Sequence, residues 1–408
     1  MNILFMSLGS FTSLDGSSVH LDVLKKLAQD HNVYLLCKRE RREGKPTELT
    51  YERGVNVLRV RTGNITKAPM IEKGIATIMI ERQFKRAIKK YFANVAFDLV
   101  LYTTPPITFG GVVKYVKERD GAKTYLMLKD IFPQNAVDLG ILKTTGLRGL
   151  IYKRFRRQEQ ELYRISDHIG CMSPANCQYI LRNNPELAPE KVELCPNITV
   201  IEDVGVDQAT RDAIRAKYGL PQDSKIFVYG GNLGKPQDVP FIIECVRAQR
   251  EPRAFFLVVG SGTEFQRLER FAQEDAPPNF KLLSHMPKND YEKLVAARDV
   301  GMIFLDHRFT IPNFPSRLLS YMKAKKPVLA VVDSNTDVGT TVVEGGFGWS
   351  CKSADPTLFA NLVRQIVETP QGEIDAMQER EFQFLKERYN PDVACNAILQ
   401  HFNKETTN

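Results

Sequence analysis

The sequence predicts an α/β protein made of two domains, each built on a parallel β-sheet. Apolar segments of strand length alternate with helical segments from the first residues onwards, which is typical of parallel strands joined by crossover helices. The chain has 408 residues, which is long enough for two full hydrophobic cores. Its hydrophobic content of 43% and charged content of 25% are those of a soluble globular protein.

The first half of the chain contains six segments that we expect to be strands, and a helix is expected over residues 18–30. Because ligands bind at the carboxyl ends of the strands in open parallel sheets, functional residues are expected in the loops that follow them. The six expected strands are 2–7, 33–37, 55–61, 97–102, 122–128 and 168–172.

The loop after the first strand carries two glycines and the first acid/base candidates. Gly9 and Gly16 allow tight turns and close approach of a ligand to the backbone. Asp15 and His20 are able to exchange protons with a substrate. An ordinary connecting loop, in which Ser17 caps the next helix, is the alternative interpretation.

A second candidate lies where the apolar strand 122–128 ends directly in Lys129 and Asp130. Charged groups at the carboxyl end of a buried strand are typical of catalytic residues in α/β enzymes. Asp130 is placed to take a proton from an acceptor hydroxyl. The alternative is a Lys–Asp pair that only satisfies the loop.

Two basic segments in the first half predict contact with an anionic membrane surface. Residues 67–92 combine an apolar stripe with a basic cluster, and a second basic run covers residues 153–157. A helix with a solvated positive face is the alternative. The stripe is Ile71, Ile75, Ile78 and Met79, and the cluster is Arg82, Lys85, Arg86, Lys89 and Lys90.

The net charge of +8 fits nucleic acid, an anionic membrane or anionic small substrates as partners. No RNA- or DNA-binding motif is present, so nucleic acid is not expected as a partner. The seven cysteines are scattered without a Cys-x-x-Cys pair, which favours a reducing compartment over a disulfide framework or a zinc site. The N-terminal segment predicts a strand rather than a signal peptide, and no apolar run approaches the ~20 residues needed to cross a bilayer.

The second half begins near residue 200 and repeats the alternation of strands and helices. The strand 225–229 is followed by a glycine-rich loop, an arrangement that can cradle a phosphate. Further strands are expected over 255–260 and 301–305, and between them a strand that ends in a turn over 280–287. The polar or flexible residues that follow the first three of these strands are Gly231, Asn232 and Lys235, then Gly262, then His285.

Residues 312–330 are expected to form a loop, a helix, a turn and a buried strand. Pro315 suits the first turn of a helix, Asn313 or Ser316 can cap it, and Pro327 ends it before the strand 328–332. The N-terminus of a helix has free N–H groups and a positive dipole end, so it can hold a phosphate. An ordinary loop–helix–strand unit is the alternative interpretation.

This segment resembles the nucleotide-sugar-binding helix of glycosyltransferase family 4, usually written Pro-Ser-Lys-x-x-Glu-Tyr-Met-Ala-x-Gly-Lys-Pro-Val. Two positions that are typically Glu in the family hold Asn313 and Ser320 here; both can form hydrogen bonds, but neither carries a negative charge. The matching residues are Pro315, Ser316, Arg317, Tyr321, Met322, Lys326, Pro327 and Val328.

Three segments of the first half, over residues 102–107, 126–140 and 172–176, resemble the bacterial O-antigen and capsule branch of that family, in particular N-acetyl-L-fucosamine transferases. The resemblance implies a GT-B fold, in which two Rossmann-like domains face each other across a cleft. The implied domains are an acceptor-binding domain over 1–200 with membrane-facing basic helices, a nucleotide-sugar-binding domain over 201–385, and a C-terminal helix over 386–408 that crosses back.

The implied activity is transfer of an acetamido sugar from a UDP-sugar to a polyprenyl-diphosphate-linked sugar, at the inner face of the bacterial cell membrane. No metal or other cofactor is implied, and the sequence has no Asp-x-Asp motif. A UDP-sugar epimerase of the same architecture and a non-catalytic assembly partner are the two alternatives.

The resemblance also implies a role for each candidate residue. Asn313 and the main-chain N–H groups of residues 314–316 meet the sugar and phosphate, Ser320 meets the ribose, and Lys235 and Arg317 meet the diphosphate. The implied donor residues are Gly9, Gly16, Gly231, Asn232, Lys235, Gly262, His285, Asn313, Phe314, Pro315, Ser316, Arg317 and Ser320. Asp130, Asp15 and His20 are the catalytic candidates, and Lys129, Asn135 and Asp138 are the acceptor-binding candidates.

Overall fold

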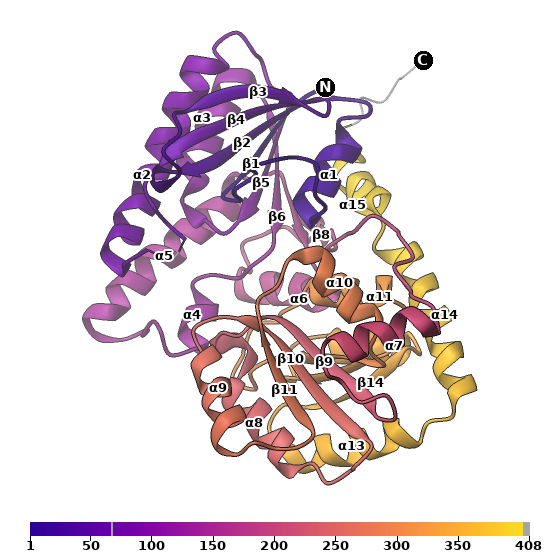
Figure 1. The fold of residues 1–408 in the computed structure, drawn as a ribbon. Coiled ribbons are helices and arrows are strands. Elements are labelled where there is room, and N and C mark those ends of the chain that lie inside the picture. The colour runs from indigo at the N-terminus through magenta and orange to yellow at the C-terminus, as the bar shows by residue number, and fades with distance from the viewer. Residues whose placement is uncertain (67, 403–408) are drawn as a thin grey trace. The chain divides into compact units, whose positions relative to one another are not determined.

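The structure, a computed structural model, describes residues 1–66 and 68–402 (Figure 1). The side chains at positions 70, 71, 147, 148 and 288 lie outside this description, which includes Ile71 of the expected apolar stripe. Residues 403–408 of the expected C-terminal segment lie outside it as well. The chain divides into two compact units. Unit 1 comprises Met1–Val200 with Pro391–Asn408, and unit 2 comprises Ile201–Asn390.

Unit 1 is built on a sheet with the strand order β3-β4-β2-β1-β5-β6-β7-β8. All neighbouring strands are parallel except β3 and β4, which are antiparallel. The six strands expected from the sequence are confirmed, with their ends shifted by at most a few residues. The strands are β1 (Asn2–Ser7), β2 (Asn32–Glu40), β3 (Glu48–Glu52), β4 (Val55–Thr62), β5 (Leu99–Thr104), β6 (Lys123–Leu128), β7 (His168–Cys171) and β8 (Val192–Leu194).

Helices cover both faces of this sheet (Figure 1). The central strands β1 and β5 are almost entirely buried because helices cover each face, and successive side chains point to opposite faces. Ile3 and Phe5 share a core with α1 (Val19–Leu27) and α15 (Pro391–Leu399). The opposite face carries α2 (Met70–Tyr91), α3 (Gly110–Asp120) and α5 (Gly146–Ile165), and the remaining helices of the unit are α4 (Gln134–Asp138) and α6 (Pro174–Asn183).

Unit 2 has an all-parallel sheet with the strand order β11-β10-β9-β12-β13-β14. Its strands are β9 (Lys225–Asn232), β10 (Ala254–Ser261), β11 (Phe280–Ser284), β12 (Val300–Phe304), β13 (Val328–Val332) and β14 (Gly348–Lys352). Its helices are α7 (Gln208–Lys217), α8 (Val239–Ala248), α9 (Phe265–Glu274), α10 (Lys288–Ala296), α11 (Arg317–Lys323), α12 (Val338–Glu344), α13 (Pro356–Glu368) and α14 (Gln371–Arg388).

The strand orders locate one ligand-binding position in each unit. The order reverses between β1 and β5 in unit 1 and between β9 and β12 in unit 2. A crevice opens at the carboxyl ends of the two strands that flank such a reversal, because the connections leave in opposite directions. The loops after β1, β5, β9 and β12 are therefore where each unit is built to bind a ligand.

None of the helices in the described part of the chain combines the length and the apolar run that a bilayer crossing requires. All seven cysteines are free thiols.

Candidate active site

In unit 2, the residue that stands out at the reversal between β9 and β12 is Arg317, the first residue of α11. Its guanidinium lies 4.0 Å from the centre of the Tyr229 ring on β9. A Cβ atom at Gly231 would come within 2.8 Å of Arg317 Nη2, so the guanidinium rests on the bare backbone at the end of β9. No carboxylate among the described residues pairs with it, which leaves a positive charge available at this crevice.

The glycines of this edge hold the two neighbouring loops together. A Cβ atom at Gly262 would lie 2.2 Å from the Leu233 carbonyl oxygen, and one at Gly260 would lie 2.0 Å from the Gly231 carbonyl oxygen. The Leu233 N–H donates to the Ser261 carbonyl at 2.9 Å. Gly262 therefore serves loop packing, a role that the sequence interpretation did not give it.

The loop after β9 arranges its own polar groups. The Tyr229 hydroxyl donates to the Asn232 carbonyl at 2.7 Å, and Gln237 Oε1 accepts from the Gly234 N–H at 3.1 Å. Asn232 Nδ2 reaches the same Gln237 oxygen at 3.4 Å. Lys235 is exposed in this loop, so its ammonium is a second positive charge near the crevice.

Asn313 lies in the loop before α11, and its Nδ2 atom is buried with no acceptor among the described residues. The carbonyl of the same residue accepts from the Thr336 hydroxyl, which fixes the loop in place. A buried amide nitrogen without a partner is costly unless a ligand supplies the acceptor. Asn313 is thus the donor-loop side chain whose surroundings most favour a bound ligand.

The start of α11 differs from its expected form in two ways. Ser316 occupies the N-cap position, but its side chain makes no capping hydrogen bond. Pro315 has no N–H, so it cannot donate to a phosphate as the resemblance implied for residues 314–316. The Phe314 side chain is buried, with its ring centre 6.1 Å from that of Tyr389, and it serves the core.

Two other expected donor residues show no contact that ties them to this group. Ser320 lies half-buried on α11, and His285 is exposed just after β11. Their roles on the ribose and the base stay predictions.

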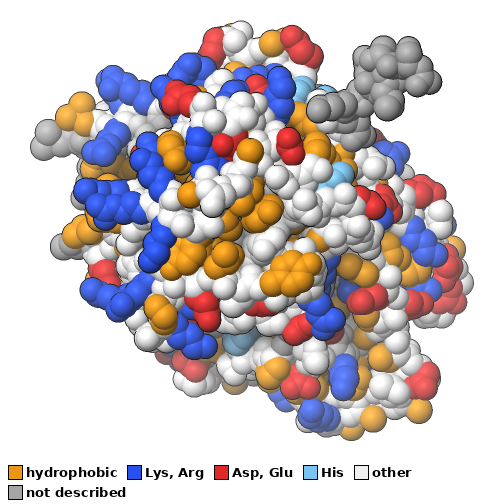
Figure 2. Space-filling model, turned by 90° about the horizontal axis from the view of Figure 1, so that it is seen from above, with side chains coloured by type: hydrophobic (Ala, Val, Ile, Leu, Met, Phe, Trp, Pro, Cys, Tyr) orange, Lys and Arg blue, Asp and Glu red, His pale blue; other side chains and the backbone are white. Residues whose placement is uncertain are grey.

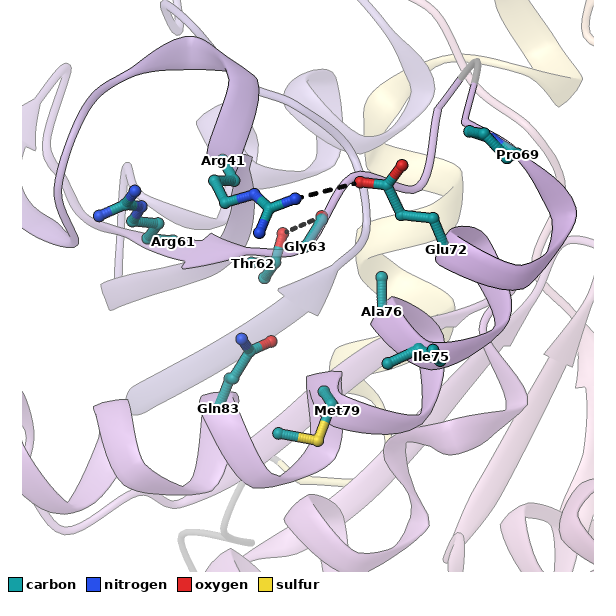
Figure 3. Close-up of a pocket in the computed structure, with 10 residues that line it drawn as sticks. All are labelled: Arg41, Arg61, Thr62, Gly63, Pro69, Glu72, Ile75, Ala76, Met79 and Gln83. Carbon is teal, nitrogen blue, oxygen red and sulfur yellow. Dashed lines mark hydrogen bonds and ion pairs between the residues drawn. The ribbon is translucent and has the colours of Figure 1, made fainter.

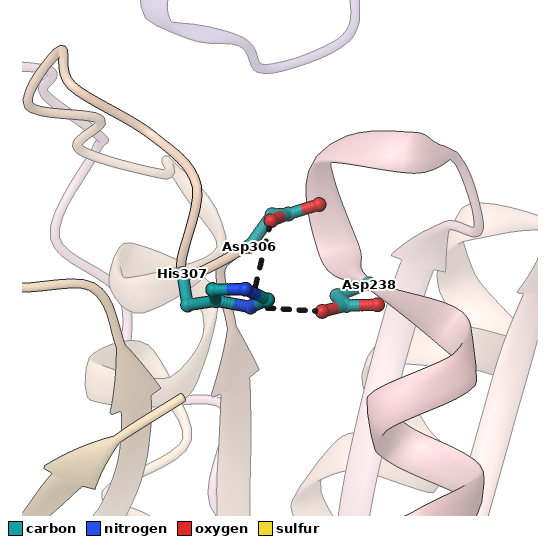
Figure 4. A group of neighbouring side chains, drawn as sticks. All are labelled: Asp238, Asp306 and His307. Carbon is teal, nitrogen blue, oxygen red and sulfur yellow. Dashed lines mark ion pairs between the residues drawn. The ribbon is translucent and has the colours of Figure 1, made fainter. Parts of the chain in front are cut away.

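Sequence analysis missed a cluster that joins the loops after β9 and β12 (Figure 4). His307 Nδ1 lies 3.4 Å from Asp238 Oδ2 and 3.8 Å from Asp306 Oδ1. Both oxygens of the buried Asp306 also accept from the Arg308 guanidinium, and the Asp306 N–H donates to the Pro236 carbonyl. The Arg308 charge balances Asp306, so the cluster fastens the two loops that border the crevice. The sequence signal that could have indicated this cluster is Asp306, which closely follows the apolar strand β12.

In unit 1, Asp130 has the surroundings expected of a catalytic carboxylate. It follows β6, and Asn135 Nδ2 donates to both of its oxygens at 2.8 Å. Burial raises the pKa of Asp130 to about 6, against the hydrogen bonds from Ile131 and Asn135, which lower it. A carboxylate with a pKa near neutrality is suited to accept a proton from a hydroxyl.

Lys129 precedes Asp130 in the chain, and His20 lies near the Lys129 charge. The Lys129 ammonium donates to the carbonyls of Cys195 and Pro196 at 3.3 Å, so it holds the segment after β8 and forms no ion pair with Asp130. Burial, with the nearby charge of Lys129, lowers the pKa of His20 to about 4. His20 is therefore neutral at physiological pH and can act only as a base or a hydrogen-bonding group.

The remaining acidic residues expected in unit 1 form hydrogen bonds with neighbouring side chains. Asp15 is exposed and accepts from the Arg53 guanidinium at 2.6 Å and from the Ser13 hydroxyl at 2.7 Å. Asp138 accepts from Gln134 Nε2 at 2.8 Å.

The two glycines of the loop after β1 differ in their surroundings. The Phe11 ring folds over Gly9, where a Cβ atom would meet it at 2.6 Å. Gly16 faces open space.

Comparison with known proteins links this geometry to a reaction class. Residues 210–382 match the model of the family described as Glycosyl transferases group 1. The chain is 24% identical over 307 residues to the probable glycosyltransferase WbjE of Pseudomonas aeruginosa, covering 74% of each protein. It is also 24% identical over 246 residues to the putative colanic acid biosynthesis glycosyl transferase WcaI of Escherichia coli (strain K12), covering 59% of each.

The structure superposes on that of Anabaena Alr3699/HepE in complex with UDP and glucose, with a TM-score of 0.69 and 14% sequence identity. The match covers 98% of this chain and 99% of HepE, so both units share that fold. The two parallel-sheet units and the matched transferase domain make this chain a glycosyltransferase with the GT-B fold.

Proposed function

We propose that the chain transfers an acetamido sugar, N-acetyl-L-fucosamine, from a UDP-sugar to a polyprenyl-diphosphate-linked sugar in O-antigen or capsule polysaccharide biosynthesis. The similarity to the colanic acid biosynthesis glycosyl transferase WcaI supports a polysaccharide pathway, and the UDP complex of HepE supports a uridine nucleotide as carrier of the donor sugar. The sugar itself is proposed from the segments over 102–107, 126–140 and 172–176 that resemble N-acetyl-L-fucosamine transferases.

The observation that carries the proposal is the unpaired Arg317 guanidinium beside the bare backbone of Gly231. When the bond between sugar and diphosphate breaks, negative charge grows on the departing UDP, and a fixed positive charge there stabilises the transition state. Stacking on Tyr229 fixes the guanidinium, so little further ordering is needed during the reaction. Lys235 supplies a second charge from the loop after β9, and we propose that these two residues act without a metal ion.

The acceptor hydroxyl is activated by Asp130 in this proposal. Its pKa of about 6 leaves the carboxylate ionised at physiological pH while keeping it basic enough to take the proton as the new glycosidic bond forms. Asn135 holds both carboxylate oxygens and so orients the base.

The lipid-linked acceptor requires contact with a membrane, and α2 offers a surface for it. Ile75 and Ile78 are 60% and 61% exposed, and Arg82, Arg86, Lys89 and Lys90 are exposed further along the helix. Lys and Arg side chains gather on the left of Figure 2, the side on which Figure 1 places α2 and α5. Apolar side chains beside cations favour an anionic lipid surface. We propose a peripheral position on the inner face of the bacterial cell membrane.

The proposal is tested by measuring nucleotide release from UDP-sugars, with and without polyprenyl-diphosphate-linked acceptor. Release of UDP from UDP-N-acetyl-L-fucosamine only when the acceptor is present supports transfer. Conversion of the donor sugar without acceptor supports the epimerase instead, and no reaction with any UDP-sugar rejects the proposed donor.

A further inference from the structure

We propose that a pocket at the edge of unit 1 binds the diphosphate and the first isoprene units of the lipid-linked acceptor. The inference rests on the proposed transfer to a polyprenyl-diphosphate-linked sugar and adds the place where the lipid end is held. The pocket has a volume of about 680 Å³ and lies between the end of β4 and the first turns of α2 (Figure 3). The described residues that line it include Arg41, Arg61, Glu72, Ile75, Met79 and Gln83.

The pocket shares an edge of the sheet with the proposed base. Glu40 at the end of β2 pairs with Thr62 at the end of β4, and these strands run parallel to β1, β5 and β6. All their carboxyl ends therefore lie on one edge, and Asp130 follows β6. The strands β2, β1 and β5 lie between β4 and β6, so β4 and β6 are four strand spacings apart. At ~4.8 Å per spacing this is about 19 Å. One sugar unit is much shorter than this spacing, so a diphosphate in the pocket would present an acceptor hydroxyl to Asp130 only if several sugar units separate the two.

One wall of the pocket is cationic. The Arg61 guanidinium has no carboxylate partner within the described part of the chain. Arg41 Nη2 lies 3.5 Å from Glu72 Oε1, and their side chains are 64% and 36% exposed. An exposed pair of this length contributes little stability, so Arg41 can turn to a stronger anion. Two guanidinium groups match the paired phosphates of a diphosphate, which arginine binds with fork geometry.

The opposite wall is apolar and leads outwards along α2. Ile75 and Met79 line the pocket although they are 60% and 38% exposed, and Ile78, beside them on the helix, is 61% exposed. Figure 3 shows Gln83 pointing from α2 towards the strand end that carries Thr62, whereas the Met79 side chain points away from that strand. Cations on one wall and exposed apolar side chains on the other match an anionic amphiphile better than a free anion.

The surrounding contacts fix the shape of the pocket. The buried Glu40 carboxylate accepts from Lys38 Nζ at 2.6 Å and from the Thr66 N–H at 2.8 Å, which anchors the loop after β4. Asn64 Nδ2 donates to Glu72 Oε1 at 2.8 Å and ties that loop to α2. A Cβ atom at Gly63 would lie 2.7 Å from the Ala76 Cβ, so strand end and helix are in close contact.

The test is isothermal titration of the full chain with farnesyl diphosphate, a short polyprenyl diphosphate, in the presence of saturating UDP. The wild type and the Arg61→Gln and Arg41→Gln variants are compared, with Lys45→Gln as a control that removes one exposed charge from the neighbouring loop. We expect each arginine variant to weaken binding about tenfold, the loss of one charge-assisted hydrogen bond, and Lys45→Gln to leave it within about twofold. Inorganic pyrophosphate is expected to bind at least about tenfold more weakly, because it lacks the apolar part.

Three results would overturn the inference. Unchanged affinity in both arginine variants would place the ligand elsewhere, and equal binding of inorganic pyrophosphate would reduce the pocket to an anion site without lipid recognition. Failure of the wild type to bind farnesyl diphosphate would reject the site. A separate titration with UDP distinguishes the two proposals: UDP binding without farnesyl diphosphate binding rejects this pocket alone, whereas the reverse rejects the proposed donor.

Discussion

At the scale of single residues, Arg317 and Asp130 differ from the many charged residues whose charges are balanced inside the chain. Asp15, Glu40 and Asp306 all accept hydrogen bonds from cationic side chains. Arg317 has no carboxylate partner among the described residues and rests on Tyr229, while Asp130 is held by an amide. Charged groups kept without a counter-charge are costly in a folded protein, and they are found where a ligand supplies the missing charge.

The Arg317→Gln variant should bind UDP about 10- to 100-fold more weakly than the wild type, because it loses one or two charge-assisted hydrogen bonds to the diphosphate. Isothermal titration with UDP measures this. Arg317→Lys should recover part of the loss, and Arg267→Gln, which removes an exposed cation from α9 of the same unit, serves as the control. Wild-type affinity in Arg317→Gln would show that the diphosphate lies away from this guanidinium.

The Asp130→Asn variant should lose about a hundredfold or more of kcat, because an amide cannot take the acceptor's proton. In the wild type, kcat/KM should rise with pH up to about 6 and then level off, as the carboxyl of Asp130 loses its proton near that pH. Asp375→Asn, an exposed change on α14, provides the control. A variant with normal turnover, or a rate that does not change between pH 5 and 7, would exclude Asp130 as the base.

The same substitution should stabilise the fold at neutral pH. The folded chain raises the pKa of Asp130 from 3.8 to about 6, so it binds the proton more tightly than the unfolded chain does. The contribution of Asp130 to the free energy of unfolding is present below pH 4 and is lost as the pH rises through 6. At pH 7.5, removing the charge should therefore raise the free energy of unfolding by about 1–3 kcal/mol. Urea unfolding at pH 7.5 and at pH 4 measures the difference, which should disappear at the lower pH.

At the scale of elements, the edges of the two sheets decide where chemistry is possible. The glycines after β9 and β10 let two loops pack backbone against backbone, and this close packing positions Arg317 over the end of β9. The buried strands supply the rigidity, since unit 2 packs the aromatic rings of Phe227, Phe256 and Phe304 into one core.

A Gly262→Ala substitution should lower the free energy of unfolding by about 1–3 kcal/mol, because its Cβ would meet the Leu233 carbonyl at 2.2 Å. Gly372→Ala in α14 meets no atom within 4 Å and should be neutral or stabilising by about 0.5 kcal/mol. Denaturant unfolding of the pair measures both changes. Equal stability of the two variants would contradict the loop packing described for β9 and β10.

A double substitution of Ile75→Asn with Ile78→Asn should reduce binding to anionic vesicles by about tenfold or more, since both side chains are exposed on α2. Vesicle flotation with phosphatidylglycerol measures the effect. Leu358→Asn, which changes a residue 44% exposed on α13 of unit 2, should bind as the wild type does. Unchanged vesicle binding in the double variant would remove α2 from the membrane surface.

Strands and helices were predictable from the sequence where the apolar pattern was long and uninterrupted. The strands β1 and β13 begin and end at the expected residues. The edge strand β3 was missed because Glu48–Glu52 has no buried residue to produce a pattern. The expected cap at Ser316 does not form, because a capping side chain must also be oriented by its neighbours, which the sequence does not specify.

The candidate site was predictable only in part, and the reason is distance along the chain. Asp130 and Arg317 could be proposed because each directly follows a recognisable local pattern. The stacking of Arg317 on Tyr229 joins residues from different elements, and so does the cluster of Asp238, Asp306 and His307. Such contacts depend on strand order, which local patterns do not determine.

In the whole molecule, the two units have different roles in the proposed reaction. We propose that unit 2 binds the nucleotide diphosphate at its strand-order reversal, and that unit 1 provides the base and the lipid-facing helix. The proposed chemistry needs no metal, so addition of a chelator such as EDTA should leave the transfer rate within about twofold of its value, because Arg317 and Lys235 supply the neutralising charge. Loss of activity that Mg²⁺ or Mn²⁺ restores would contradict this part of the account.

We propose that the chain moves a sugar from UDP to a lipid-linked acceptor. Mass spectrometry of a polyprenyl-diphosphate-linked sugar, after incubation with the full chain and UDP-N-acetyl-L-fucosamine, tests it most directly. The account predicts that the acceptor gains the mass of one acetamido-deoxyhexose residue while an equal amount of UDP is released. An acceptor of unchanged mass, with the UDP-sugar either intact or converted to an isomer, would contradict it.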